Sequence, residues 1–470
     1  MSIVVIPGAS VSLLAAVGIR NVSDLDRAAY KPILQSFLAV MGKIDQDPEY
    51  TPPSLKPELP AEHRSFSKPP PAQNPMNAWS HLCEIKSPSA SQGQSSPPRL
   101  LQGRTVAIKD NISVAGLPTT LGLSPELFEG GQYPISGVDA VVVARLLSGG
   151  AVTSLLPTAE IAIGSDQAGS VRIPACYCGI YGLKPTFGLV PYTGAASMSP
   201  MIDHLGPLAA TLEDVAAVLE TVAGYDGLDP RMSPESPMRD NVKPYAAILA
   251  DFRARDATEL GTWKIGLLRE GFNMTGVSDA VRDTVLAAAR SGFEAAGATV
   301  VDVSVPMHSD GAVLWNASTR PSMATWLLQG RASGHLTYLP PHIRPVTGHL
   351  PVSDDAEGSR CASVLNEHTP AAINILLSQQ AANDKLTPGL EAKAHRRVLA
   401  LRAAYDAVLG DVDVLITPCA PNVAPELPSA TASVSEKLAY AIGTTNNTAP
   451  FNATGHPALN VPSDPAPSCQ

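Results

Sequence analysis

Cysteine is scarce in this chain of 470 residues, which has only six, at positions 83, 176, 178, 361, 419 and 469. Cysteines this sparse and irregularly spaced exclude the disulfide framework of a small secreted domain. Cys176 and Cys178 form a C-x-C pair, but no second pair and no nearby histidine completes a set of zinc ligands. We therefore interpret both as small buried residues, and we expect neither a metal nor any other cofactor.

Charged residues are also few, at 16% of the chain, and 33 basic against 43 acidic side chains give a formal net charge of -10. No basic cluster stands out. This excludes nucleic acid as a partner, because binding to phosphates requires concentrated lysine and arginine. The sequence also lacks an apolar run of about 20 residues, which excludes anchoring by a transmembrane helix.

The first twenty residues, MSIVVIPGASVSLLAAVGIR, are apolar enough for a secretory signal. They lack its basic start, however, and Pro7 and Gly8 interrupt the apolar run. We therefore expect the protein in the cytoplasm.

A helical segment and a proline-rich stretch begin the chain. Behind Ser23, a typical helix cap, apolar residues recur at spacings of three and four, namely Leu25, Ala28, Ala29, Ile33, Phe37 and Val40. Of the 50 residues from 51 to 100, 11 are prolines, which predicts a linker over the surface. Residues 1–99 are thus interpreted as an N-terminal helical segment with a proline-rich linker, and residues 100–470 as the main domain.

From about residue 100 onward, strand-like and helix-like segments alternate. Strands are expected at residues 104–110, 160–166, 263–270, 298–306 and 412–418, and helices at residues 139–150, 211–224 and 278–297. This alternation predicts an α/β fold, with helices packed over a parallel or mixed sheet.

Ser170, on a turn of small residues after the strand at 160–166, is a candidate nucleophile. A serine hydroxyl is protonated at neutral pH, so it attacks a carbonyl only when a positioned base takes its proton. Lys109 ends the apolar strand at 104–110 and has two interpretations. It pairs with Asp110 or Asp166, or it is a desolvated amine whose pKa has fallen toward neutrality, and only the second can be a base. Taken alone, the turn at Ser170 also fits a purely structural role.

Long motifs favour the catalytic interpretation of Lys109 and Ser170 over the structural one. AIKDN at 107–111 is followed by GSDQAGSVRIPACYCGIYGLKPTFGLVPYTG, IDHLGPLAATLEDVAAVLETVAGYDGLDPR, KIGLLREGF, YDAVLGDVDVLITP and NTAPFNATGHPALNVP. In this order the motifs resemble the amidase signature family over nearly the whole chain. The leading helical segment is similar to that of free-standing amidases with an N-terminal helical domain. The resemblance implies a mixed sheet covered by helices on both faces.

The family's activity is hydrolysis of a carboxamide to carboxylate and ammonia through a Ser, cis-Ser, Lys triad. Carried over by motif, the resemblance implies that Lys109 is the base and Ser170 the nucleophile. The backbone N–H groups of Gln167, Ala168 and Gly169, with that of Ser170, would form the oxyanion hole. As partners we expect a small-molecule amide and, as an option, a second copy of the chain.

Asp166 and Arg172 flank the turn, and we interpret them as a bracing ion pair. His204 and His456 are interpreted as core or turn residues, and His368 lacks a second ligand at metal spacing.

The sequence differs from the family in the segment that supplies the relay serine, which passes the proton from the nucleophile to the lysine. Members place a GGSSGGS block, which supplies the relay serine, before the nucleophile turn. This chain has no such block, which implies that a strand and a loop have been excised at about residues 151–154. Ser148 and Ser154 are only weak candidates for the relay. The chain also stops soon after GHPALNVP, where family members continue into a further strand and helix, and an unpaired sheet edge is expected.

We therefore expect a serine amidase whose activity is reduced or lost. Two alternatives stay open. The first is an inactive homologue that acts by binding, and the second is the amidase-type subunit of a glutamine-dependent amidotransferase.

Overall fold

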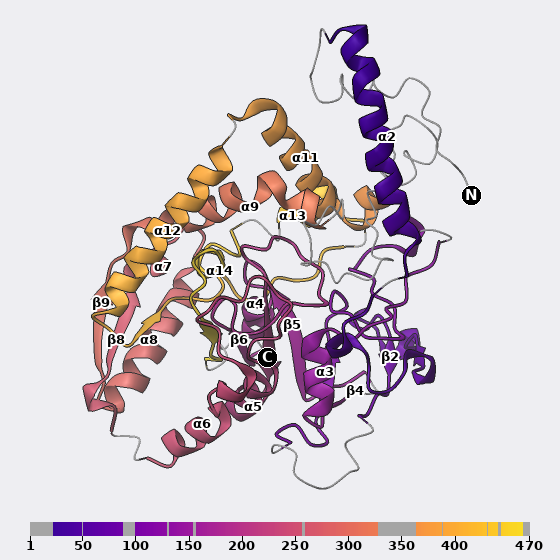
Figure 1. Ribbon diagram of the computed structural model, residues 1–470. Helices are drawn as coiled ribbons and strands as arrows, with labels where there is room; N and C mark the ends of the chain where they lie inside the picture. The colour runs from indigo at the N-terminus through magenta and orange to yellow at the C-terminus, as the bar shows by residue number, and fades with distance from the viewer. Residues whose placement is uncertain are drawn as a thin grey trace. The chain divides into compact units, whose positions relative to one another are not determined.

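The computed structural model describes residues 22–48, 50–87, 99–128, 131–153, 157–255, 259–327, 363–387, 389–429, 431–439 and 443–463. The chain divides into two compact units, residues 1–52 and residues 53–470 (Figure 1). The sequence-based division after residue 99 stays a prediction. Among the described residues, no helix combines the length and apolar character needed to cross a bilayer.

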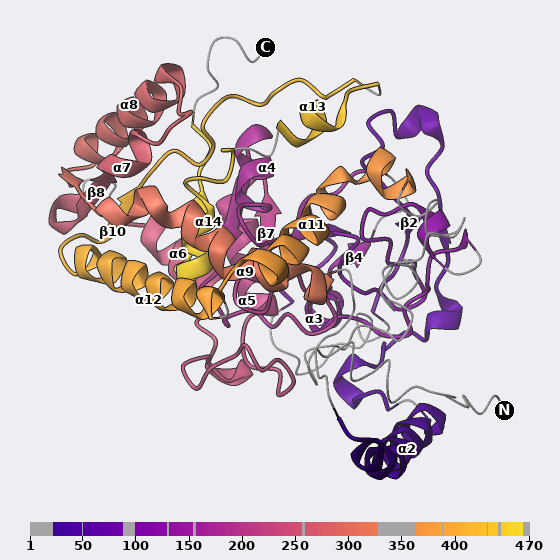
Figure 2. The ribbon, with the colours of Figure 1, turned by 90° about the horizontal axis from the view of Figure 1, so that it is seen from above.

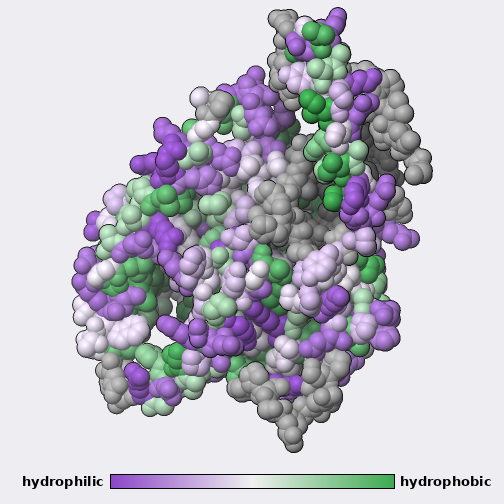
Figure 3. Space-filling view, viewed as in Figure 1, coloured by the Kyte–Doolittle hydropathy of each residue, from purple (hydrophilic) through white to green (hydrophobic). Residues whose placement is uncertain are grey.

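The described part of the first unit is dominated by α2 (Asp24–Gln46). The Ser23 side chain accepts a hydrogen bond from the backbone N–H of Asp26, which confirms the predicted cap. Figure 3 shows apolar side chains along this helix, and those that are exposed include Leu25, Tyr30, Ile33, Phe37, Val40, Met41 and Ile44.

The second unit contains a six-stranded mixed sheet in the order β11-β6-β7-β5-β3-β4. Strand β3 is parallel to β4 and β5, and the other pairs are antiparallel. The strands of this sheet are β3 (Thr105–Ile108), β4 (Val152–Thr153), β5 (Ile161–Asp166), β6 (Tyr181–Lys184), β7 (His204–Ala209) and β11 (Ala458–Asn460). Among the described residues β11 pairs only with β6, so it forms an edge of the sheet.

The remaining strands form two smaller sheets. Strands β8 (Lys264–Leu268), β9 (Thr299–Val303) and β10 (Val414–Ile416) are parallel in the order β10-β8-β9, and β1 (Phe66–Ser67) pairs with β2 (Leu82–Cys83). The α/β class with a mixed sheet is confirmed. The described strands form three sheets, however, because no described strand joins the edge at β11 to the three parallel strands.

Helices cover both faces of the six-stranded sheet. On one face, Ile161 and Ile163 of β5 join the core of α3 (Val141–Ser148) and α5 (Leu212–Val222). On the other face, Gly182 leaves room for α4 (Arg172–Tyr177), because a Cβ there would lie 2.5 Å from the Cβ of Ala175. This close approach sets the position of the turn before α4, which carries Ser170.

The other helices lie along the rest of the second unit (Figure 2). They are α6 (Tyr245–Arg253), α7 (Arg269–Phe272), α8 (Asp279–Ala295), α9 (Gly311–Leu327), α11 (Pro370–Lys385), α12 (Leu390–Leu409), α13 (Val434–Ala439) and α14 (Ala449–Thr454). Helix α9 contacts α11, α12 and α14. All the strands and helices predicted beyond residue 100 are present, each within a few residues of its expected ends.

The proline-rich stretch differs from the expected surface linker. Leu55 and Ile85 are buried, and the guanidinium of Arg64 makes two hydrogen bonds to the Asp139 carboxylate, at 2.7 and 2.8 Å. Both charged side chains are almost wholly buried. Apolar residues between the prolines thus attach residues 53–87 to the rest of the second unit.

The predicted excision falls between two parallel strands. Strands β4 and β5 lie on either side of β3, and Thr153 and Ile161 both pair with Val106. Only residues 154–160 join them, whereas a crossover between parallel strands usually takes a dozen residues or more. A connection between parallel strands must run back along the length of the first strand. Because β4 has only two residues, a short connection is sufficient here.

Candidate active site

Lys109 and Ser170 line one cavity of about 880 Å³. Lys109 directly follows β3, and Ser170 lies on the turn between β5 and α4. Other walls of this cavity are formed by Trp79, His81, Asp110, Thr120, Tyr133 and His368. The two residues predicted as base and nucleophile therefore face the same space.

The Lys109 amine is held by a neighbouring strand. Its Nζ donates to the Ser165 hydroxyl at 2.9 Å, and the Asn111 amide donates to the same oxygen at 3.1 Å. A neutral Lys109 amine that donates to Ser165 in this way keeps its lone pair free to accept a proton.

Desolvation and nearby charges set the pKa of the Lys109 amine. Desolvation lowers the pKa of Lys109 below its ordinary value, while the charges of Asp166 and Asp110 act in the opposite direction. As a whole residue Lys109 is exposed at the cavity wall, and only the hydrogen bond of its amine to Ser165 is part-buried. Of the two interpretations, the structure favours the desolvated amine, because neither aspartate forms a salt bridge with it among the described residues.

A buried ion pair braces the nucleophile turn. Arg172 donates to both oxygens of Asp166, at 2.9 and 3.0 Å, and Asp166 also accepts from the backbone N–H of Val171. Burial alone would raise the pKa of Asp166, but Arg172 and its hydrogen bonds outweigh burial and hold the pKa well below its usual range. The predicted structural role of this pair is confirmed.

The carbonyl groups of the turn have specific partners. The Trp315 indole donates to the Gln167 carbonyl at 2.8 Å, and the Thr448 hydroxyl donates to the Ala168 carbonyl at 2.5 Å. In a trans peptide, the N–H of the next residue points the opposite way. The N–H groups of Ala168 and Gly169 are therefore turned away from these two donors.

Gly169 can be nothing but glycine. Its φ is 141°, and a Cβ there would lie 2.5 Å from the Thr448 hydroxyl oxygen. The small residues of this turn thus let Thr448 approach the backbone.

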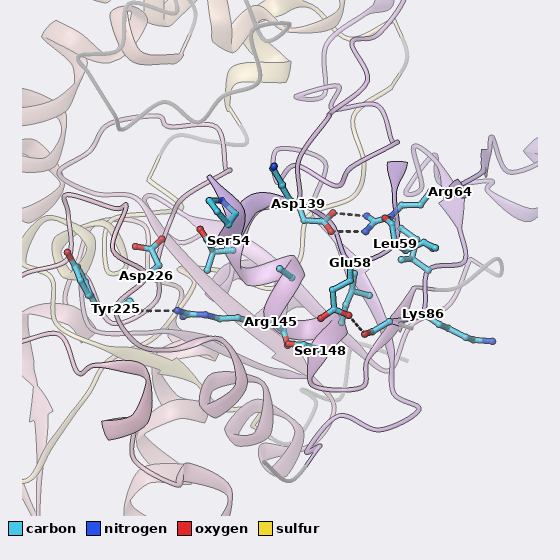
Figure 4. Close-up of a pocket in the computed structure, with 17 residues that line it drawn as sticks. Ser54, Glu58, Leu59, Arg64, Lys86, Asp139, Arg145, Ser148, Tyr225 and Asp226 are labelled. Carbon is cyan, nitrogen blue, oxygen red and sulfur yellow. Dashed lines mark hydrogen bonds and ion pairs between the residues drawn. The ribbon is translucent and has the colours of Figure 1, made fainter. Parts of the chain in front are cut away.

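Ser148, one of the two weak relay candidates, is not brought to Lys109. It donates to the carbonyl of Arg145 at 3.1 Å and lines a separate cavity of about 390 Å³ (Figure 4). In this cavity Arg145 donates to the carbonyls of residues 222–225. Ser154, the other candidate, lies outside the described residues.

The three histidines lie as follows. His204 is buried with its Nδ1 at 2.8 Å from the Ile202 carbonyl, and His456 contacts Asp406 at 2.9 Å. His368 is exposed at the rim of the large cavity. The described residues contain no group of three or more histidine, cysteine or acidic side chains placed to hold a metal.

Sequence reasoning missed Ser165, Trp315 and Thr448. Ser165 lies inside the quoted motif, and the neighbouring position of β3 and β5 was the signal that would have found it. Trp315 and Thr448 carry no local signal, because they reach the turn only through the fold.

Comparison with known proteins identifies the family to which this chain belongs. Residues 157–467 match the family model described as Amidase; Ser170 falls within the match and Lys109 precedes it. An enantioselective amidase of Rhodococcus rhodochrous is 31% identical over 479 residues, covering 92% of this chain and 84% of that protein. A glutamyl-tRNA(Gln) amidotransferase subunit of Synechococcus sp. (strain CC9311) is 29% identical, covering 79% of this chain and 78% of that protein. A solved bacterial aryl acylamidase superimposes with a TM-score of 0.55 at 17% identity, covering 79% of this chain and 78% of that chain. The chain therefore belongs to the amidase signature family.

Proposed function

We propose that the protein hydrolyses a small carboxamide to a carboxylate and ammonia, with Ser170 as nucleophile and Lys109 as general base. The observation that carries the proposal is the shared cavity of a desolvated lysine amine and a serine on a braced turn. A lysine with a lowered pKa is neutral in a larger fraction of molecules, so it can accept the serine proton.

In the proposed reaction, Ser170 Oγ forms a bond to the amide carbon while its proton passes to the Lys109 amine, directly or through one water. The carbonyl oxygen becomes an oxyanion, which the N–H groups of Gln167, Ala168 and Gly169 stabilise together with that of Ser170. Protonated Lys109 then gives its proton to the nitrogen as the C–N bond breaks, and ammonia leaves. A water hydrolyses the acyl-serine by the same steps.

We infer that the reaction is slowed by the missing relay. Among the described residues, Ser165 is the hydroxyl that hydrogen-bonds to the Lys109 amine, and it does not line the cavity that Ser170 faces. The family match begins at residue 157, just beyond the predicted excision, which supports a loss at this point. We therefore propose a working but impaired amidase.

A fluorophosphonate probe tests the nucleophile. We expect the probe to label Ser170 in the purified chain, and Ser170→Ala to abolish both labelling and ammonia release from a small aromatic amide. Labelling at another serine, with ammonia release kept in Ser170→Ala, would refute the assignment. Labelling without any turnover would favour the inactive homologue that acts by binding.

The amidotransferase alternative is favoured by relatives such as the Synechococcus protein. It predicts ammonia release from glutamine only when partner subunits are present. Turnover of a simple amide by the purified chain alone contradicts it.

We also propose a cytoplasmic location, which is supported by four free cysteines among the described residues. Self-association into a homodimer stays a prediction, and sedimentation of the full chain tests it.

A further inference from the structure

Three apolar side chains form a strip on the six-stranded sheet beside the proposed catalytic residues. Ala107 of β3 pairs with Ala162 of β5, and Ala162 pairs with Leu208 of β7. Residues that pair directly across neighbouring strands point to the same face of a sheet, so these three side chains lie in one row. All three are half-buried, and they line the cavity of about 880 Å³ that Lys109 and Ser170 share.

The strip lies on the face of the sheet that carries α4. A Cβ at Gly164 would lie 3.3 Å from the side chains of both Leu208 and Val171, the residue before α4. Helix α4 packs against β6 and β11, so it covers one end of this face and leaves the strip over β7, β5 and β3 beside it. The helix also leaves part of its own surface open. Cys176 is half-buried and Cys178 is exposed, so the prediction that both are buried is wrong.

The connection between β4 and β5 is short at the place where a covering helix is usually found. Residues 154–160 pass β3 to join these two parallel strands. Such a crossover usually includes a helix and takes a dozen residues or more, and helices normally cover both faces of parallel strands. The strip is therefore open to the cavity and is not covered by a helix of this crossover.

The other walls of the cavity are also largely apolar. Val114, Leu117 and Leu123 line it and are buried. Trp79 and Tyr133 add aromatic residues to the wall. The phenol of Tyr133 donates to the Leu123 carbonyl at 2.8 Å, so its polar group is already engaged. Apolar surface thus faces the substrate space from several sides.

Charged groups are few among the described residues that line this cavity, namely Lys68, Lys109 and Asp110. Lys109 is assigned to the reaction, and Asp110 accepts a hydrogen bond from the Thr120 hydroxyl. A charged group placed on the apolar strip would lose water without gaining a partner there, whereas an apolar group gains free energy by leaving water. The lining therefore favours an apolar ligand.

We propose that Ala107, Ala162 and Leu208 form the floor of an acyl-binding site, and that the substrates are primary amides with a bulky apolar acyl group. This inference rests on the proposed function, because the acyl group is attached to the carbon that Ser170 attacks. The two alanines determine the specificity, since their small side chains leave room for the acyl group above the sheet.

Binding of amides to the Ser170→Ala chain tests the proposal without turnover. Phenylacetamide should bind about 10- to 150-fold more tightly than acetamide, the factor expected from burying a group of the size of a phenylalanine side chain. Succinamic acid, whose acyl group ends in a carboxylate, should bind no better than acetamide. Ligand-observed NMR titrations measure the dissociation constants. The proposal is overturned if acetamide or succinamic acid binds as tightly as phenylacetamide.

Ala162→Leu, made in the Ser170→Ala chain, places a larger side chain at the centre of the strip. It should weaken the binding of phenylacetamide about tenfold and lower the preference for phenylacetamide over acetamide. Ala107→Val, a smaller change in the same row, should act in the same direction. The matched control is Ala144→Leu, at a half-buried alanine of α3 that lines the separate cavity of about 390 Å³, and it should keep the preference. An unchanged preference in the strip variants, shown by thermal melts to be folded, contradicts the proposal.

The same two amides separate this proposal from the proposed function. If the chain with Ser170 intact releases no ammonia from either amide, while the Ser170→Ala chain prefers phenylacetamide, the proposed hydrolysis fails and the acyl-binding site stands. If ammonia is released from both amides with equal kcat/KM, and both bind equally, hydrolysis stands and the acyl-binding site is overturned. The binding result decides the proposal even where a strip variant folds poorly.

Discussion

The amine of Lys109 lies 2.9 Å from the hydroxyl oxygen of Ser165, a buried residue on the neighbouring strand β5. This contact fixes the amine at the wall of the cavity that Ser170 also lines. Ser165 does not itself line that cavity, so we interpret it as a positioning residue behind the base.

Ser165→Ala should lower kcat by about tenfold and leave KM nearly unchanged, because the amine loses a neutral hydrogen bond of about 1 kcal/mol and its fixed position. Ser165→Thr, which keeps the hydroxyl on a side chain suited to a strand, should retain most of the rate. Steady-state kinetics with one small aromatic amide measures both. A fall in melting temperature with unchanged kcat would indicate a structural role alone.

Lys109→Met should abolish turnover while the fold persists, because methionine keeps the length and the apolar packing and removes only the amine. In the wild type, the rate should rise with pH through the lowered pKa of Lys109. Between that pKa and the ordinary value, the unfolded chain binds more protons at this position, so its contribution to stability also rises with pH. A thermal melt at several pH values, beside the pH-rate profile, checks both. Equal loss of folding in the variant would favour an ion-pair role.

Trp315→Phe and Thr448→Val should each reduce kcat by about tenfold, since each removes a donor that orients a carbonyl of the turn. Removal of a donor that contacts the oxyanion itself typically costs about 100- to 1,000-fold, so a smaller loss is expected here. Thr448→Ser keeps the hydroxyl and is the matched control. Wild-type kcat in both variants would show that the turn holds its shape without them.

Arg172→Met should destabilise the fold by about 3 to 5 kcal/mol, because it leaves the buried Asp166 carboxylate without its cation. In the wild type, Asp166 has a lowered pKa, so its contribution to stability is present above about pH 4 and is lost as the pH falls below that value. Urea unfolding at pH 7 and pH 3 measures this. The variant should lose less stability than the wild type on acidification, and an equal loss in the two proteins contradicts the assignment.

Insertion of a GGSSGGS loop and its preceding strand at residues 151–154 should raise turnover at least about a hundredfold, within the range that general base catalysis contributes. The restored chain should also melt at a higher temperature, because the added strand covers apolar surface. Both proteins are assayed on one amide at matched concentration. Equal rates would mean that a water or an existing serine already relays the proton.

The sequence by itself determined the order of strands and helices. Apolar residues at every second position indicate strands, and apolar residues three and four apart, with caps at Ser23 and Ser278, indicate helices. Both patterns involve residues that are close together in the chain. The same local character revealed the tight turn at Gly169 and, through long motifs, the roles predicted for Lys109 and Ser170.

Only the tertiary structure decided which groups surround that turn. Ser165 reaches Lys109 across 56 residues because β3 and β5 pair in parallel. Thr448 meets Ala168 across 280 residues, because α14 and the turn after β5 are brought together by the fold. A single residue of each pair looks ordinary in the sequence. The partners are brought together by sheet order and helix packing, which depend on the whole chain and leave no local periodicity to detect.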